Sequence, residues 1–317
     1  ILRIEDTDRE RLVEGATDVI LRTLEVTGLH YDEGPGVGGA HGPYVQSERK
    51  PIYMEYAKRL VDADAAYYCF CTKERLSALH EEDENGGYDR HCRDLPAEEV
   101  ERNLAAGMPF VIRQKMPLTG KTSYVDAVFG EISVENEELQ DQILVKADGD
   151  PTYNFAHVVD DYLMGVTHVV RGSGYLTSTP KYVLLYDAFG WERPTYVHLP
   201  LLMGKNADGT VSKLSKRHGA VSFQDLLSDG FLPEAVINYI ALLGWCPKGE
   251  DAEKEFFTLR ELEETFSITG VNKSPSVFDF DKLLWFNGEY IKALPFARFC
   301  ELARPFLRTP FPPAVQV

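Results

Sequence analysis

The stretch GTVSKLSKRHG, residues 209–219, places three cationic side chains on one short loop between two glycines. The cations are Lys213, Lys216 and Arg217, and Ser215 lies among them. Ammonium groups on such a loop can neutralise the charge that develops on a leaving phosphate, which is usually the largest contribution to catalysis in nucleotidyl transfer. The alternative is a solvated basic loop, because short KxxK patterns are common.

The sequence that leads into this loop favours the first interpretation. Residues 195–202 form a strand-like apolar run, and residues 182–189 form an apolar run that begins after Pro180 and ends at Gly190, as a helix does. A helix followed by a strand and a charged glycine-flanked loop is what a nucleotide-binding α/β unit requires. The sequence therefore predicts an α/β fold around this loop.

The composition limits the class of protein. The chain has 317 residues, of which 44% are hydrophobic and 26% charged, as in a globular protein with two or three domains. No run approaches the ~20 apolar residues of a membrane span. The net charge of −17 argues against a general nucleic-acid coat, so RNA would have to be bound by local basic patches. Five cysteines, an odd number, indicate a reducing compartment rather than a disulfide framework.

The first residues, ILRIE, alternate apolar and polar side chains and predict a strand over residues 1–5. Glu5 would then lie at the carboxyl end of a strand, where open α/β sheets place their ligands. A helix is expected to follow and to end at Gly28, and Asp8 can cap its start. Both interpretations of Glu5, as a ligand contact and as a second helix cap, remain open at this point.

A helix followed by a strand is also predicted within PTYNFAHVVDDYLMGVTHVVRG, residues 151–172. Tyr153, His157 and Asp161 recur at four-residue intervals and therefore share one helix face. Tyr and His on a helix face are more often core groups with satisfied hydrogen bonds than ligand contacts. Arg171 ends the predicted strand, where its guanidinium could fork onto a carboxylate.

Three cysteines are spaced as metal ligands could be. Cys69 and Cys71 are separated by one residue, and Cys92 follows about twenty residues later, close to Asp94. Three thiolates and one carboxylate can complete a tetrahedral zinc site. His91 is a rival fourth ligand, and buried thiols without a metal are the alternative.

The pattern between the cysteines and the second helix differs from the α/β pattern around it. Residues 96–106 predict a helix, and several short strands are predicted at 110–115, 123–129, 131–134 and 139–145. We therefore expect residues 70–145 to form an inserted subdomain. After Ala220 the chain predicts mainly helices, which begin near Pro233, Thr258, Asp279 and Pro295. Cys246 and Cys300 are expected to lie in the core.

Three separated motifs resemble one family. The KLSKR pattern of residues 213–217 resembles the KMSKS signature of class I aminoacyl-tRNA synthetases, in the form typical of the glutamyl branch. IEDTDRER, from Ile4 onward, resembles the IEDTDxxR segment of glutamyl-tRNA synthetases, and residues 151–172 resemble their PTYxxAxVVDDxxMGVTHVxRG segment. The order and spacing of the motifs also fit, so the chain resembles bacterial glutamyl-tRNA synthetases over essentially its whole length.

The resemblance implies a domain organisation. Residues 1–69 and 146–220 would form an incomplete Rossmann-type catalytic domain of class I, and residues 70–145 an inserted α+β subdomain that grips the acceptor end of tRNA. Residues 221–294 would form a helical stem-contact domain, and residues 295–317 the start of a helical anticodon-binding domain. The family's HIGH signature is absent from this sequence, so we expect an interior fragment that is inactive on its own.

The resemblance also implies a function, glutamate–tRNA ligase. Such an enzyme uses ATP with Mg²⁺ to form glutamyl adenylate, requires tRNA for this step, and transfers glutamate to the 3′ end of tRNA(Glu). In the family's roles, glutamate would be bound by Glu5, Tyr153, His157 and Arg171. Leu201 and Leu202 would meet adenine, and the leaving pyrophosphate would be stabilised by Lys213, Ser215, Lys216 and Arg217. Zn²⁺ would be held by Cys69, Cys71, Cys92 and Asp94, which stands where zinc-bearing relatives have His. We expect a cytoplasmic monomer with no membrane contact.

Three alternatives are open. The nearest is the paralogue that glutamylates queuosine in tRNA(Asp), the second is a glutaminyl enzyme, and the third is a non-catalytic RNA-binding protein derived from a synthetase. The third is favoured by one departure from the family: residues 171–175 read RGSGY where relatives commonly read RGEEW.

Overall fold

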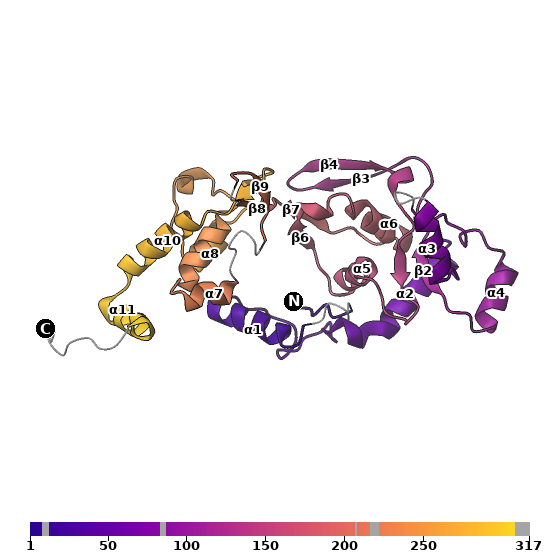
Figure 1. Cartoon of the computed structure of the whole chain (residues 1–317), viewed down its shortest axis with the longest axis horizontal. Coiled ribbons are helices and arrows are strands. Elements are labelled where there is room, and N and C mark those ends of the chain that lie inside the picture. Colours follow the sequence, from indigo (N-terminus) through magenta and orange to yellow (C-terminus); the bar gives the residue numbers. More distant parts are fainter. Residues whose placement is uncertain (8–12, 83–86, 207, 216–221, 308–317) are drawn as a thin grey trace. The chain divides into compact units, whose positions relative to one another are not determined.

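The computed structural model of the chain describes residues 1–7, 13–82, 87–206, 208–215 and 222–307. The chain divides into two compact units (Figure 1). Unit 1 comprises residues 1–18 and 30–198, and unit 2 comprises residues 19–29 and 199–317. Each unit has its own hydrophobic core.

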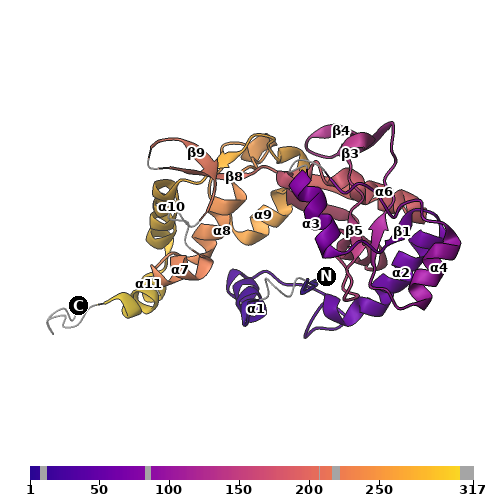
Figure 2. The same ribbon diagram turned by 45° about the vertical axis from the view of Figure 1, so that its right-hand side comes forward.

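Unit 1 contains two small sheets. The first is antiparallel, and its strands lie in the order β1 (Ala66–Cys69), β2 (Val111–Gln114) and β5 (Ile143–Val145). The second has the order β4 (Gly130–Glu135), β3 (Lys121–Asp126), β7 (Thr195–Leu199) and β6 (His168–Gly172). β3 and β4 form an antiparallel hairpin, visible in both views (Figures 1 and 2), and Asp126 at the end of β3 pairs with Tyr196 of β7. The hairpin of β3 and β4, which lies within the range 70–145 expected to be an insertion, is thus joined directly to a strand from beyond that range in sequence.

The core of unit 1 lies where three helices meet the first sheet. The helices of unit 1 are α2 (Lys50–Asp62), α3 (Lys73–Glu82), α4 (Ala97–Ala105), α5 (Tyr153–Leu163) and α6 (Thr179–Phe189), of which α2, α5 and α6 form this core. Tyr53 of α2, Phe155 of α5 and Tyr182 of α6 are completely buried in one cluster. A buried aromatic side chain of this kind contributes about 1.5–3 kcal/mol or more. The middle of α5, from Phe155 to Asp161, is buried, so its polar residues His157, Asp160 and Asp161 need partners within the protein.

An aromatic stack covers the carboxyl ends of α5 and α6. The indole of Trp191 lies parallel to the ring of Tyr162, with 3.9 Å between ring centroids, and close to parallel to Phe189, at 4.0 Å. Gly190 allows this arrangement because it ends α6 in the left-handed conformation, with φ of 68°. The predicted end of this helix is confirmed.

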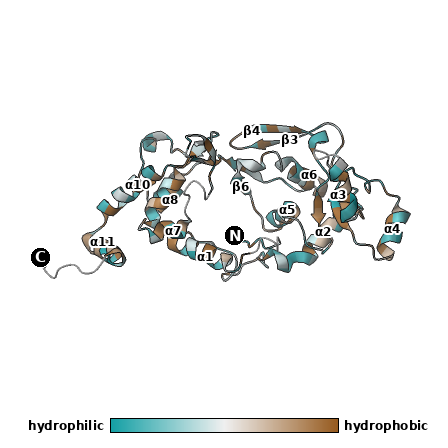
Figure 3. Cartoon of the chain, in the orientation of Figure 1, coloured by the Kyte–Doolittle hydropathy of each residue, from teal (hydrophilic) through white to brown (hydrophobic). Residues whose placement is uncertain are grey.

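Unit 2 is built mainly of helices. They are α1 (Ala16–Thr27, which belongs to this unit from Val19 onward), α7 (Phe223–Ser228), α8 (Pro233–Ala241), α9 (Leu259–Thr265), α10 (Phe280–Ala293) and α11 (Phe296–Ala303). A three-stranded sheet accompanies them, in the order β10 (Ser276–Val277), β8 (Leu202–Lys205) and β9 (Val211–Lys213). The hydrophobic residues of α8 and α10 appear brown in Figure 3, and those that face each other form the core of the unit. Among the described residues, no helix has both the length and the apolar character needed to cross a bilayer.

The predicted starts of the helices in unit 2 are confirmed. Thr258 forms a capping box with Glu261, Asp279 caps α10 through its carboxylate, α8 begins at Pro233, and α11 begins directly after Pro295. The capping box of Ser222 with Asp225, at the start of α7, was not predicted. Each cap satisfies backbone N–H groups that have no partner within the helix.

Four expectations from the sequence were wrong. The first helix, expected to start with Asp8 as its cap, begins only at Ala16, after a turn at Glu14 and Gly15. Residues 1–5 do not form a strand, because Ile4 makes only an isolated bridge to Val45. The run 195–202 is not one strand but contains the whole of β7 and the first residue of β8, since Pro200 between them has no N–H to donate. Cys246 and Cys300 are exposed rather than in the core.

Candidate active site

A hollow of about 230 Å³ opens in unit 1 between the N-terminal segment, α5 and β6. Its lining comprises Arg3, Glu5, Tyr153, His157, Asp161, Val166, His168, Val169, Val170 and Arg171. The α5 residues contribute one helix face, as their four-residue spacing predicted. The hollow therefore brings together all four residues expected to bind glutamate.

One wall of the hollow is acidic. The Nη2 atom of Arg3 lies 2.9 Å from the Glu5 carboxylate and 2.9 Å from that of Asp161. Burial opposes a charge on Arg3, but Asp161 and Glu5 outweigh it and raise the pKa of the guanidinium above its ordinary value. Arg3 is thus always charged, and it holds the two carboxylates in place. Glu5 keeps about a third of its side chain exposed, so it can still accept a cationic group from a ligand.

Asp160, the neighbour of Asp161 on α5, holds the acidic wall in place through buried hydrogen bonds. Its side chain is fully buried and accepts hydrogen bonds from Arg49 Nε at 2.8 Å, Gln46 Nε2 at 2.9 Å and the Tyr53 hydroxyl at 2.7 Å. The Nε atom of Arg3 lies 3.6 Å from the same carboxylate. A buried carboxylate is tolerated only with such a set of donors, which ties α5 to α2 and to the N-terminal segment.

The opposite wall carries the guanidinium of Arg171, near the end of β6. Its Nε lies 3.3 Å from His198 Nε2, and its Nη2 donates to the Thr179 hydroxyl at 2.7 Å. The guanidinium carbon lies 5.0 Å from the ring centroid of Tyr175 and 4.8 Å from that of Tyr182. The Nη1 atom is buried and makes no hydrogen bond within the described part of the chain. A buried cationic nitrogen without an acceptor is well suited to receive an anionic ligand.

Tyr153 and His157 lie between the two walls. Their rings are 5.0 Å apart, and His157 Nδ1 lies 3.3 Å from the Asp161 carboxylate. His157 Nε2 is buried and has no hydrogen-bond partner among the residues that the structure describes. Burial is the largest effect on Tyr153 and raises the pKa of its hydroxyl, which therefore stays protonated and can donate a hydrogen bond. The hollow can thus receive a small molecule with an anionic end near Arg171 and a cationic end near Glu5.

The residues expected to bind nucleotide lie in unit 2. Leu202 begins β8 and Lys213 ends β9, which pairs with β8, while the carbonyl of Leu201 accepts a hydrogen bond from Ser276. Ser215 lies two residues after the end of β9. Lys216 and Arg217 lie outside the described residues, so their predicted roles stay predictions.

The three cysteines predicted to bind metal lie close together in unit 1. The sulfur atoms of Cys69, Cys71 and Cys92 all lie within 4.8 Å of one another, and the Cys71 and Cys92 sulfurs are 3.6 Å apart. The hydrogen bonds from Cys92 and from the Tyr88 hydroxyl lower the pKa of the Cys69 thiol and so favour its thiolate. Sulfurs bound at ~2.3 Å to one tetrahedral zinc would be roughly 3.8 Å apart, so the cluster fits the metal.

The fourth zinc ligand is not part of this cluster. Asp94 and His91 are both exposed, and neither belongs to the group of close ligand atoms found among the described residues. The prediction that Asp94 completes the site therefore stays a prediction.

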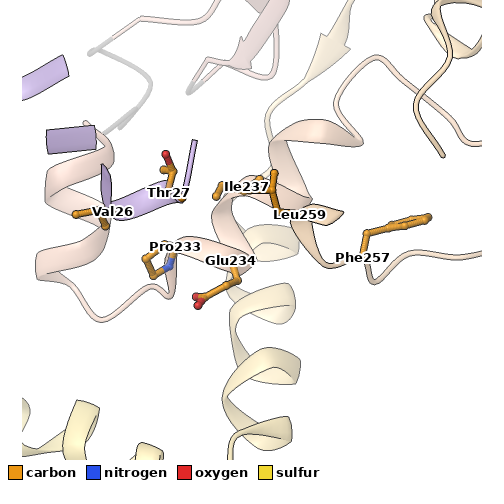
Figure 4. Close-up of a pocket in the computed structure, with 8 residues that line it drawn as sticks. Val26, Thr27, Pro233, Glu234, Ile237, Phe257 and Leu259 are labelled. Atoms are coloured by element: carbon orange, nitrogen blue, oxygen red, sulfur yellow. The ribbon is translucent and has the colours of Figure 1, made fainter. Parts of the chain in front are cut away.

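A second hollow, of about 180 Å³, lies in unit 2 (Figure 4). Its lining is largely apolar and comprises Val26, Thr27, Gly28, Pro233, Glu234, Ile237, Phe257 and Leu259. Glu234 supplies its only ionisable side chain. It lacks the opposed charges of the hollow in unit 1, which is why we place the candidate active site in unit 1.

Sequence reasoning missed several residues of the site. Thr179, Tyr182 and His198 surround Arg171 but carry no motif, because they come from α6 and β7 rather than from the segment around Arg171. Tyr175 was noticed only as part of the unexplained RGSGY departure. It packs its ring against Arg171, which gives one residue of that departure a place in the site.

These geometric features agree with comparisons to known proteins. Residues 1–285 match the family described as tRNA synthetases class I (E and Q), catalytic domain. The chain therefore belongs to this family, and its fold is the mixed α/β catalytic fold of class I synthetases.

The individual relatives carry one name. The chain is 60% identical over 306 residues to a glutamate–tRNA ligase of Clostridium novyi, and 56% identical over 312 residues to that of Clostridium tetani. The alignments cover 96% and 97% of this chain but 61% and 62% of the relatives, so the chain spans about three fifths of their length.

A crystal structure of the glutamate–tRNA synthetase of Elizabethkingia anophelis superposes with a TM-score of 0.87 at 36% identity, covering 98% of this chain and 68% of that one. A glutamate–tRNA ligase from Elizabethkingia meningosepticum, solved in complex with its amino acid, has the same TM-score and identity and is covered to 67%.

Proposed function

We propose that this chain is the catalytic part of a glutamate–tRNA ligase. The carboxylate of glutamate attacks the α-phosphate of ATP, which gives glutamyl adenylate and pyrophosphate. A ribose hydroxyl at the 3′ end of tRNA(Glu) then attacks the activated carbonyl carbon and releases AMP. The observation that carries this proposal is the hollow in unit 1, which is lined by the cationic side chain of Arg171 and by the carboxylates of Glu5 and Asp161.

In this proposal, each wall of the hollow binds one end of glutamate. Arg171 receives the side-chain carboxylate, and Glu5, held by Arg3, receives the ammonium group. Tyr153 and His157 line the space between them and orient the substrate. A site built on fixed hydrogen-bonding groups contributes to catalysis chiefly by positioning.

The remaining roles follow the family. Leu201 and Leu202 contact adenine, and Lys213, Ser215, Lys216 and Arg217 stabilise the leaving pyrophosphate. Mg²⁺ accompanies ATP and neutralises charge on its phosphates. Cys69, Cys71 and Cys92 hold a structural zinc ion, which would stiffen the start of the inserted segment that binds the tRNA acceptor end. We further infer that the enzyme acts in the cytoplasm as a monomer.

The proposal is tested by ATP–pyrophosphate exchange on the protein expressed from the complete reading frame that contains this chain. Exchange with glutamate, and not with glutamine, is expected when tRNA is added. Arg171→Lys is expected to raise the KM for glutamate about 10- to 100-fold, because the loss of a charge-assisted hydrogen bond costs about 1.5–3 kcal/mol. The matched control is Arg193→Lys, which changes an exposed Arg paired with Asp187 and should leave the KM unchanged.

Other outcomes would select another function. Exchange with glutamate in the absence of tRNA would favour the paralogue that modifies tRNA(Asp). Preference for glutamine would favour the glutaminyl enzyme. No exchange under any condition would refute the proposal and favour a binding protein derived from a synthetase.

A further inference from the structure

The groups that surround Arg171 form a continuous chain of hydrogen bonds that begins in the inserted segment. The first is Asp126, at the end of β3, whose side chain is almost fully buried. Its Oδ1 atom accepts the backbone N–H groups of Val128 and Phe129, at 3.0 and 2.8 Å, and so fixes the β3–β4 turn. Its Oδ2 atom accepts the backbone N–H of His198 at 3.1 Å. Asp126 is therefore held rigidly from two sides.

The second group is His198, a fully buried residue of β7. Its Nδ1 atom lies 2.6 Å from Asp126 Oδ2, and its Nε2 atom lies 3.3 Å from Arg171 Nε. An ionised carboxylate can only accept a hydrogen bond, and a guanidinium can only donate one. Nδ1 must therefore carry the hydrogen, and Nε2 must present a lone pair to Arg171. The opposite tautomer would place two N–H groups head to head.

The third group is Thr179, which begins α6 and is fully buried. Its hydroxyl lies 2.8 Å from the carbonyl oxygen of Tyr175 and donates to it, which leaves its oxygen free to accept from Arg171 Nη2 at 2.7 Å. The same oxygen lies 3.4 Å from His198 Nε2. Two acceptors, one on β7 and one on α6, thus hold two of the three guanidinium nitrogens.

The charges around His198 also favour its neutral form. Burial lowers the pKa of the imidazole, and the positive charge of Arg171 lowers it further, against the opposing effect of Asp126. Among the residues that the structure describes, the only other titratable ring beside His198 is that of Tyr124, with 6.4 Å between the two ring centroids. A neutral His198 can accept a hydrogen bond from Arg171, whereas an imidazolium would repel it.

We propose that Asp126, His198 and Thr179 are positioning residues that hold the guanidinium of Arg171 in one orientation at the hollow, and that they thereby select a carboxylate ligand over a carboxamide. The hydrogen bonds at Nε and Nη2 oppose rotation of the guanidinium, so its positive charge stays directed at the ligand. A glutamate side chain supplies a negative charge and two acceptor oxygens, whereas the carboxamide of glutamine is neutral and offers one acceptor oxygen. This inference rests on the proposed function, since it concerns the side-chain end of the same amino-acid site.

Two substitutions at His198 separate its two hydrogen bonds. The amide of His198→Asn lies where Nδ1 was and keeps a donor for Asp126, but offers nothing to Arg171. The amide of His198→Gln reaches the position of Nε2 and restores an acceptor for Arg171. We expect His198→Asn to raise the KM for glutamate about tenfold, with the KM for ATP unchanged, and to narrow the preference for glutamate over glutamine. His198→Gln should stay within about threefold of the unchanged protein.

Matched variants control for general damage. Val197→Ala removes buried methyl groups from the neighbouring position of β7, whose side chain points to the opposite face of the strand, so it should lower the melting temperature without moving the KM for glutamate. At Thr179, the third positioning residue, substitution by Val removes the hydroxyl and should raise the KM for glutamate. Thr179→Ser keeps the hydroxyl and should leave this KM close to that of the unchanged protein. Equal KM values for the Asn and Gln variants of His198, or a larger effect of Gln, would overturn the proposal.

A second measurement does not depend on activity. Two-bond ¹H–¹⁵N spectra of the unchanged protein, labelled at histidine nitrogen and assigned by the loss of signals in His198→Gln, report the tautomer and the charge of His198. At about pH 7.5 a neutral ring with hydrogen on Nδ1 is expected. Hydrogen on Nε2, or on both nitrogens, would refute the positioning role whatever the enzyme's substrate. If His198 shows the expected tautomer but the protein shows no glutamate-dependent ATP–pyrophosphate exchange, only the proposed function would be refuted.

Discussion

Asp160 offers the sharpest test of how the acidic wall is held, because its fully buried carboxylate is the common acceptor of three donors. In Asp160→Ala the guanidinium of Arg49, whose side chain is 3% exposed, loses its only carboxylate partner among the described residues. The side chains of Gln46 and Tyr53 lose their acceptor as well. Removing one member of a buried ion pair costs about 3–5 kcal/mol, because the other charge is left uncompensated.

Asp160→Asn should cost less, about 2 kcal/mol, since it keeps one oxygen acceptor and the shape of the side chain but loses the charge. For a unit of this size, each 1 kcal/mol lowers the melting temperature by about 2–4 °C. The Ala variant should therefore melt roughly 10 °C lower and the Asn variant roughly 5 °C lower.

The assay is urea and thermal unfolding, followed by hydrogen exchange of the α5 amides so that unit 1 is observed separately from unit 2. The control is Asp187→Ala, which breaks an ion pair of 2.6 Å with Arg193 whose two side chains are each at least 40% exposed. It should cost no more than about 1 kcal/mol. If Asp160→Ala destabilised unit 1 no more than Asp187→Ala does, the wall would not depend on the buried carboxylate, and this reasoning would be wrong.

Three further predictions concern catalysis, pH and metal. In the complete protein, Lys216→Ala should slow adenylate formation about 10²- to 10³-fold with little change in the KM for glutamate, measured by pyrophosphate exchange; an unchanged rate would remove Lys216 from the mechanism. Because burial lowers the pKa of folded His198 below the ordinary value near 6.5, the unfolded chain takes up a proton first on acidification. Stability should therefore be complete above about pH 6.5 and fall below it, and this slope should be reduced in His198→Gln; an identical slope would contradict the assigned environment. Removal of zinc by a chelator should lower the melting temperature. Cys92→Ser should abolish this response, and Asp94→Ala should weaken it. Equal zinc content in the unchanged protein and in the two variants would exclude the cysteine cluster as the zinc site.

The elements best predicted from the sequence are those whose signals are local. The end of α6 at Gly190 and the caps at Thr258 and Asp279 depend on one residue and its immediate neighbours, and the structure confirms each of them. The face of α5 that carries Tyr153 and His157 follows from helix periodicity alone. These features need no knowledge of the rest of the chain.

The features that were missed depend on pairing between distant segments. The alternation in ILRIE is real, but a strand also needs a neighbour, and Ile4 finds only Val45. His198 could not be recognised because its partner Asp126 lies 72 positions earlier, at the end of β3. Cys300 was placed in the core by residue type, although α11 leaves it exposed. The predicted domain boundaries and the roles of the 213–217 loop stay predictions.

The stack of Tyr162, Trp191 and Phe189 makes unit 1 optically distinguishable from unit 2. Trp191 is the only tryptophan of unit 1, and Trp245 and Trp285 both belong to unit 2. An indole held between two parallel rings absorbs and emits in a fixed, largely apolar surrounding, so its emission should shift to the red when the stack opens. A protein with Phe in place of Trp245 and Trp285 would therefore carry a single tryptophan, at the end of α6, and its tryptophan fluorescence would report on unit 1 alone.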